Sequence, residues 1–125
     1  MEITIKINTS TKECEILSMR ILSSKMMVLE ICSYLTILYE DLIDTPLNRE
    51  DTYTYARKII CYILTNKGVK DTTIMRLLNY TGATNVTDMY NSAYTLIHID
   101  KDPEIIRTVR NITKILEDYD KSLNV

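Results

Sequence analysis

The sequence predicts a small, mainly α-helical domain with a short β element at its N-terminus. Its 125 residues include only two Gly and two Pro, so long stretches run without the residues that interrupt helices. Apolar residues make up 46% of the chain and charged residues 26%, a balance that supports one buried core. We expect an N-terminal extension over residues 1–23, a helical domain over residues 24–121 and a frayed tail over residues 122–125.

The N-terminal extension begins with a strand pattern. Ile3, Ile5 and Ile7 alternate with polar residues, which is the period-two signal of a strand. The segment 14–22 fits either a second strand, which would form a hairpin with the first, or a short helix; the hairpin is favoured. Because a lone hairpin is marginally stable in water, the extension must pack on the helices or on a partner chain.

Helical spacing of apolar residues begins after this extension. The first helix follows Ser24, which we expect at the N-cap position because its hydroxyl can accept a bond from an amide of the first turn. A short turn is expected at residues 39–43. The next helix begins near Glu50 or Asp51 and ends before Gly68, since glycine is favoured just past a helix C-terminus.

The segment 71–97 predicts two helices joined by a tight turn. Asp71 is the expected N-cap of the first helix, Gly82 lies in the turn, and the second helix begins at Thr84. Two short helices joined in this way have the outline of a helix-turn-helix, the arrangement by which small helical domains present the end of a helix to DNA.

A final amphipathic helix follows this pair. Asp102 is the expected N-cap and Pro103 occupies the first helical position, where proline is favoured. Apolar residues then recur at helical spacing as far as Leu116. Fraying is expected from Lys121 onward.

The residues that carry chemistry are sparse. His98 is the only histidine, so it cannot supply a histidine-based zinc site, and a surface or capping role fits it better than catalysis. The three cysteines, Cys14, Cys32 and Cys61, form no Cys-x-x-Cys pair, and the last two lie within apolar helical patterns that predict buried, reduced thiols. Two glycines cannot build a phosphate-binding loop. We therefore expect a protein that is not an enzyme and that holds no metal and no cofactor.

Charge and hydropathy limit the partners. The net charge is −2, and no segment is strongly basic, which counts against tight non-specific binding to nucleic acid. The N-terminus lacks the basic and apolar regions of a signal peptide. No apolar run reaches the roughly 18 residues of a membrane span. The sequence therefore predicts a cytoplasmic protein without a membrane partner.

Three segments carry a family resemblance. The first comprises residues 30–35, Glu-Ile-Cys-Ser-Tyr-Leu, with Glu-Asp-Leu-Ile at 40–43. The second, residues 55–64, reads Tyr-Ala-Arg-Lys-Ile-Ile-Cys-Tyr-Ile-Leu, and the third is the predicted helix pair up to Leu96. In order and spacing, the chain from about residue 24 to 116 resembles the C-terminal DNA-binding domain of the bacterial replication initiator DnaA, a helical domain of Trp-repressor-like type.

The resemblance implies a set of DNA contacts. Arg49 stands in the loop that reaches the minor groove in this family, where the negative potential favours arginine, and Arg57 matches the family's phosphate-contacting arginine. The recognition helix of the family opens on Asp-His-Thr-Thr-Val, where this chain has Asn-Val-Thr-Asp-Met, without the histidine. The complete set of expected DNA-binding residues is Arg49, Arg57, Lys67, Lys70, Thr84, Asn85, Thr87 and Asp88, with Asn85 taking the capping role of the family's Asp.

Two functions remain open from the sequence. The first is a module that binds double-stranded DNA and acts in replication or transcription. We expect it to stand alone because the sequence shows no ATPase region, and a phage or mobile element is the expected source. The second is a protein–protein interaction module, an adaptor or inhibitor, with residues 1–23 forming a partner or homodimer edge. DNA binding predicts that Arg49, Arg57, Lys67 and Lys70 share one face with few carboxylates, whereas an interaction module predicts an exposed apolar patch.

Overall fold

The computed structural model describes residues 23–44 and 51–123, and every regular element within them is helical. This part of the chain is therefore mainly α, as predicted. Residues 1–22 of the segment expected to hold a β element, and the loop that carries Arg49, lie outside the described residues. In chain order the helices are α2 (Ser24–Tyr34), α3 (Tyr39–Asp44), α4 (Asp51–Asn66), α5 (Asp71–Leu77), α6 (Thr84–Tyr94), the π-helical turn η1 (Thr95–Ile99) and α7 (Pro103–Leu123).

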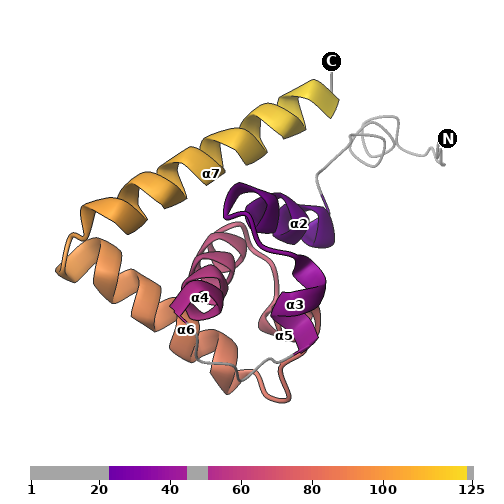
Figure 1. Ribbon diagram of the computed structural model, residues 1–125, viewed down its shortest axis with the longest axis vertical. Coiled ribbons are helices and arrows are strands. Elements are labelled where there is room, and N and C mark those ends of the chain that lie inside the picture. The colour runs from indigo at the N-terminus through magenta and orange to yellow at the C-terminus, as the bar shows by residue number, and fades with distance from the viewer. Residues whose placement is uncertain (1–22, 45–50, 124–125) are drawn as a thin grey trace, which may run out of the picture.

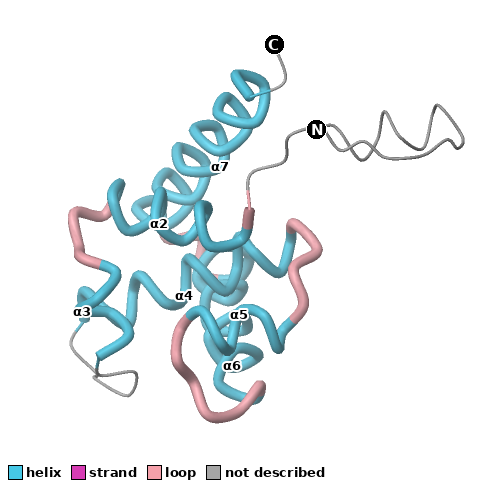
Figure 2. The backbone as a smooth tube through the Cα atoms, turned by 90° about the vertical axis from the view of Figure 1, so that its right-hand side faces the viewer, coloured by secondary structure: helices cyan, strands magenta, loops and turns pink. Residues whose placement is uncertain are grey.

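Helix α4 forms the centre of the core. Seven of its residues are buried, and they cover more than half of the circumference of the helix, a wider face than the apolar stripe of a surface helix. Helices α2, α5, α6 and α7 all contact α4, as Figures 1 and 2 show. Its fully buried side chains include Ile59, Ile60 and Leu64, and burying each such side chain contributes about 1.5–3 kcal/mol.

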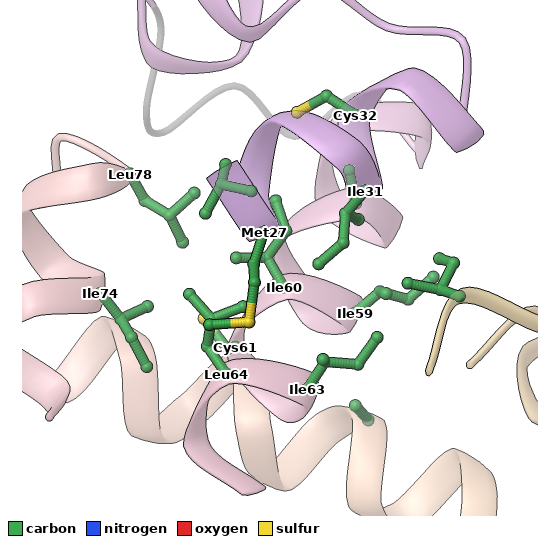
Figure 3. Packing of buried hydrophobic residues seen from close by; sticks show 14 of the residues in the cluster. Met27, Ile31, Cys32, Ile59, Ile60, Cys61, Ile63, Leu64, Ile74 and Leu78 are labelled. Atoms are coloured by element: carbon green, nitrogen blue, oxygen red, sulfur yellow. The ribbon is translucent and has the colours of Figure 1, made fainter. Parts of the chain in front are cut away.

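The close view of the core shows which helices meet on α4 (Figure 3). Met27 and Ile31 of α2, and Ile74 and Leu78 from α5 and its C-terminal end, gather around the α4 side chains. Both described cysteines belong to the same buried cluster: Cys32 is 2% exposed and Cys61 is fully buried. Both are free thiols, which confirms the prediction of buried, reduced cysteines for these two.

Three helices end in the same hydrogen-bonded reversal. After α2, α4 and α5, the residues Thr36, Gly68 and Asn79 have φ of 57°, 89° and 59°. In each case the next amide bonds back to a carbonyl five residues earlier, as Val69 N does to Leu64 O at 3.0 Å, which is the Schellman pattern. Gly68 is thus confirmed at the position just past α4.

The turn between α5 and α6 contains Gly82, as predicted, and its reversal is made at the first residue of the predicted turn. Asn79, and not Gly82, takes the left-handed conformation, and its side-chain amide donates to the Ile43 carbonyl at 3.0 Å. Asparagine tolerates this conformation because its short polar side chain can bond locally. The helix pair and its connection are therefore where the sequence predicted them, and the Asn79 bond fixes the reversal to the end of α3.

The N-caps also correct three predictions. Ser23, and not Ser24, caps α2, since its Oγ accepts from Met26 N at 3.2 Å. Asp71 is the first helical residue of α5 and not its cap, a place where a carboxylate still favours the positive helix end. Helix α6 has no side-chain cap, so Asn85 does not take the expected capping role.

Two further segments differ from the predicted helices. Residues 39–44 form a short helix rather than a turn, and α6 continues without a break into the five-residue π-helical turn η1, which the sequence pattern did not predict. At the start of α7, Asp102 Oδ1 accepts from Glu104 N at 3.0 Å, confirming Asp102 as the cap before Pro103. Helix α7 runs to Leu123, past the point at which fraying was expected.

Candidate nucleic-acid interface

The solvent face of α6 is polar apart from Tyr94, which is 44% exposed in the last turn. Thr84, Thr87, Asp88 and Asn91 are all exposed and follow one another at helical spacing, and Thr95 continues the row into η1. The opposite side of α6 is anchored in the core by Val86 and Ala93, which are 1% and 0% exposed. Helix α6 therefore presents hydroxyl and amide groups outward on a firmly packed support.

The C-terminal end of α4 and the N-terminal end of α5 converge beside α6. Thr65 from α4, Asp71 from α5, and Val86, Thr87 and Tyr90 from α6 line one open hollow. At the edge of this region the Tyr90 hydroxyl donates to Asn66 Oδ1 at 3.0 Å. The fold thus joins the connection between α4 and α5 to the opening of α6.

Lys67 and Lys70, both exposed, lie in that connection. Lys67 directly follows Asn66, which accepts the bond from Tyr90. Lys70 directly precedes Asp71, which lines the hollow. The structure therefore brings these two predicted lysines to the same end of the molecule as the predicted residues of α6. Asp71 and Asp88 lie in the same region, so its charge is mixed.

Arg57 does not lie on this surface. It is 2% exposed, and its Nη2 donates to the Leu42 carbonyl at 3.2 Å. The side chain thereby ties α3 to α4 inside the fold. A phosphate contact does not fit this buried position, and the continuous basic face expected of Arg49, Arg57, Lys67 and Lys70 is not formed by the described members of the set.

An aromatic cluster borders the polar face of α6 and was missed in the sequence. The Tyr62 and Tyr90 rings stack with centroids 5.3 Å apart, and the Tyr94 and His98 rings lie 4.3 Å apart. The Tyr62 hydroxyl is 2.8 Å from His98 Nε2. The i, i+4, i+8 spacing of Tyr90, Tyr94 and His98 is the signal that could have predicted a shared face.

Burial raises the pKa of several side chains in the described part of the fold. It raises the pKa of the Cys61 thiol from 9.0 to about 12, with Asp71 acting in the same direction and Arg57 in the opposite one. Burial also raises the pKa of Cys32 to about 11 and that of Tyr80 to about 12. Each group is therefore held in its neutral form, which is the inert form of a cysteine.

These shifts predict that stability falls at alkaline pH. Below pH 9.0 the Cys61 thiol is protonated in both states; between pH 9.0 and about 12 the unfolded chain loses the proton and the folded chain keeps it. The free energy of unfolding should then fall with rising pH, by up to about 1.4 kcal/mol per pH unit for this group. Urea titrations across this range should give a shallower decline for Cys61→Ala than for the wild type, and equal slopes would contradict the shift.

Other kinds of site are not supported among the described residues. Residues 23–44 and 51–123 contain no cluster of three or more His, Cys, Asp or Glu side chains that could hold a metal ion. Over the same ranges, no helix has the combination of length and apolar character that crossing a membrane requires.

The described chain is thus a mainly α-helical protein whose α6 presents a polar face beside two lysines. Comparison with models of known protein families, with curated proteins and with solved structures gave no match.

Proposed function

We propose that this chain is a module that binds double-stranded DNA, with α5, the reversal at Asn79 and α6 acting as a helix-turn-helix. The observation that carries the proposal is the exposed polar face of α6. A helix that enters the major groove reads bases through hydroxyl, amide and charged side chains. The resemblance of residues 24–116 to the DnaA C-terminal domain supports the same assignment.

Each side chain of the proposed interface has a distinct task. Thr84, Thr87 and Asn91 supply donors and acceptors for base edges, and Asp88 can accept from a cytosine amino group. Lys67 and Lys70 would contact phosphates and set the register of α6 on the duplex. Because the two lysines lie near two aspartates, we expect the protein to bind non-specific DNA weakly. Its affinity for a specific site should therefore depend strongly on the base contacts.

A salt-dependent titration with mixed-sequence duplex DNA tests the proposal. Wild-type affinity should fall as salt rises, and the double variant Lys67→Ala/Lys70→Ala should lower the slope of log affinity against log salt by roughly two. Lys121→Ala is the matched control, because this exposed lysine lies in the last turn of α7, at the end of the molecule away from the α5–α6 turn (Figure 1). Undetectable binding at low salt, or equal slopes for both variants, would reject DNA as the ligand.

The second candidate is a protein–protein interaction module, an adaptor or inhibitor, on the same scaffold. It is favoured by large apolar side chains left exposed at α2 and after it, including Leu29 at 42% and Leu38 at 64%. Exposed apolar surface marks contact sites when its members are contiguous. Absence of DNA binding by a folded wild-type protein is the result that would favour this candidate.

A further inference from the structure

Two aromatic side chains continue the exposed face of α6 beyond the residues proposed to contact bases. Exposed residues follow one another here at intervals of four, three and four, in the order Thr87, Asn91, Tyr94 and His98. Residues at these intervals share one side of a helix. The Tyr94 and His98 rings lie 4.3 Å apart between centroids, so they are neighbours at the C-terminal end of this face.

The π-helical turn η1 carries His98. In this turn the Asp100 amide bonds to the Thr95 carbonyl at 2.9 Å, five residues back. Single π-helical turns are rare and frequently occur at functional sites. The geometry of the turn is therefore independent support for a binding role of the residues that it carries.

A chain of hydrogen bonds from α4 holds His98. The Tyr90 hydroxyl donates to Asn66 Oδ1 at 3.0 Å, and the Tyr62 hydroxyl lies 2.8 Å from His98 Nε2. Burial raises the pKa of Tyr62, whereas a side-chain hydrogen bond with Asn66 acts to lower it. A bond that lowers the pKa of a phenol is one that the phenol oxygen accepts. The Asn66 amide thus donates to Tyr62, which leaves the Tyr62 proton for His98.

These bonds determine which nitrogen of His98 is left for a ligand. When Tyr62 donates to Nε2, the hydrogen of the neutral ring is on Nδ1, because the bond at one ring nitrogen sets the tautomer. Nδ1 is then a hydrogen-bond donor on an exposed side chain. The hydroxyl of Tyr94, which is 44% exposed, is a second donor beside it. Two neighbouring donors fit the anionic oxygens of a phosphate.

Position along the helix favours the DNA backbone over base edges for these two donors. The N-terminal residues of a recognition helix are the ones that contact bases. At a rise of about 1.5 Å per residue, the stretch from Thr84 to Asn91 is about 10 Å long, close to the roughly 12 Å width of the major groove. Tyr94 and His98 follow this stretch, so they would meet a backbone that borders the groove.

The same flank of α6 carries a proposed phosphate contact. Helices α4 and α6 pack against each other (Figure 1), and Tyr62 and Lys67 of α4 and its end line one hollow. Because Tyr62 also bonds His98, the aromatic donors lie on the side of α6 that is nearest Lys67. One DNA strand that follows this flank would meet both.

We infer that Tyr94 and His98 form a second contact with the DNA backbone, in which the Tyr94 hydroxyl and His98 Nδ1 donate to phosphate oxygens at the edge of the groove that α6 enters. The inference rests on the proposed function. Tyr62 is a positioning residue, because it acts on DNA only through the tautomer of His98. Neutral donors release no counterions, so this contact adds affinity without the salt dependence expected of Lys67 and Lys70.

Titration of the full chain with duplex DNA tests the contact. Tyr94→Phe keeps the ring and removes only the donor, so it should weaken binding roughly threefold to tenfold. The loss should be equal on two duplexes of unrelated sequence, since phosphates are common to both, and the slope of log affinity against log salt should not change. Tyr119→Phe is the matched control, because it makes the same change at a tyrosine that is 38% exposed near the end of α7.

A double-mutant cycle tests the positioning by Tyr62. His98→Phe removes the donor and keeps an aromatic ring, so it should weaken binding by a factor similar to that of Tyr94→Phe. Tyr62→Phe should weaken binding when made alone and should have no further effect in the His98→Phe variant. Equal losses in the two backgrounds would show that Tyr62 does not act through His98, and would overturn its positioning role.

The binding results separate this inference from the proposed function. A wild type that binds neither duplex overturns both. A wild type that binds, with Tyr94→Phe and His98→Phe of unchanged affinity, overturns the inference alone. Losses confined to one of the two duplexes would assign the pair to base edges, and would also overturn a backbone contact. Circular dichroism checks that each variant is folded.

Discussion

Replacing Ile60 with alanine should lower the free energy of unfolding by about 2–5 kcal/mol. Ile60 is fully buried on α4, the helix that α2, α5, α6 and α7 all contact. Removing its outer carbons leaves a cavity where several helices meet. The surrounding structure can relax into it only in part, so the loss of packing adds to the loss of burial.

Urea denaturation measures this effect, and the chain offers a matched control. Ile99→Ala makes the same chemical change at a site that is 67% exposed, where we expect a change within about 0.5 kcal/mol. Comparable costs for the two substitutions would mean that α4 is not the centre of the core. Equal slopes of the free energy of unfolding against urea concentration would show that the two variants expose similar amounts of surface on unfolding.

Periodicity and end signals made most of the helices predictable. Glycine just past α4 and the Asp102–Pro103 start of α7 are strong local signals, because each satisfies backbone groups that the helix leaves unpaired. The short helix α3 was not predictable in the same way. It has six residues and one buried side chain, Leu42, so it shows no repeating apolar pattern.

The candidate site was less predictable than the fold, because it depends on which helices meet. Tyr62 and Tyr90 are separated by 27 intervening residues in the sequence, and only the packing of α4 on α6 stacks their rings. The π-helical turn that carries His98 alters the helical spacing locally. The spacing of apolar residues in the sequence does not predict this change from α-helical to π-helical geometry. Lys67 and Lys70 were predictable as exposed charges between two helices, but their closeness to α6 was not.

Arg57 shows how a local match to a family motif can mislead. Its window, residues 55–64, matches the family helix that carries a phosphate-contacting arginine, and this match placed Arg57 among the expected DNA contacts. Helix α3 was expected to be a turn, so nothing was predicted to cover Arg57. In the structure Leu42 of α3 lies fully buried and its carbonyl accepts from the Arg57 guanidinium. The burial of Arg57 thus follows from a tertiary contact that periodicity cannot report.

Replacing Arg57 with alanine should therefore cost about 2–4 kcal/mol of stability. The variant leaves the Leu42 carbonyl without its charged donor and opens a cavity between α3 and α4. Arg57→Met keeps most of the volume, so its loss should be smaller, about 1–2 kcal/mol, and should report mainly the missing polar interactions of the guanidinium. Thermal or urea unfolding of the two variants gives both values.

The same pair of variants separates the structural role from a phosphate contact. Because Arg57 is buried, folded Arg57→Met should bind duplex DNA with the wild-type affinity and salt slope, whereas the loss of one phosphate contact would reduce that slope by about one. A variant of unchanged stability with a reduced slope would show that the guanidinium reaches DNA. An unstable variant with an unchanged slope would assign Arg57 to the α3–α4 contact, and leave Lys67 and Lys70 as the phosphate contacts among the described residues of the proposed interface.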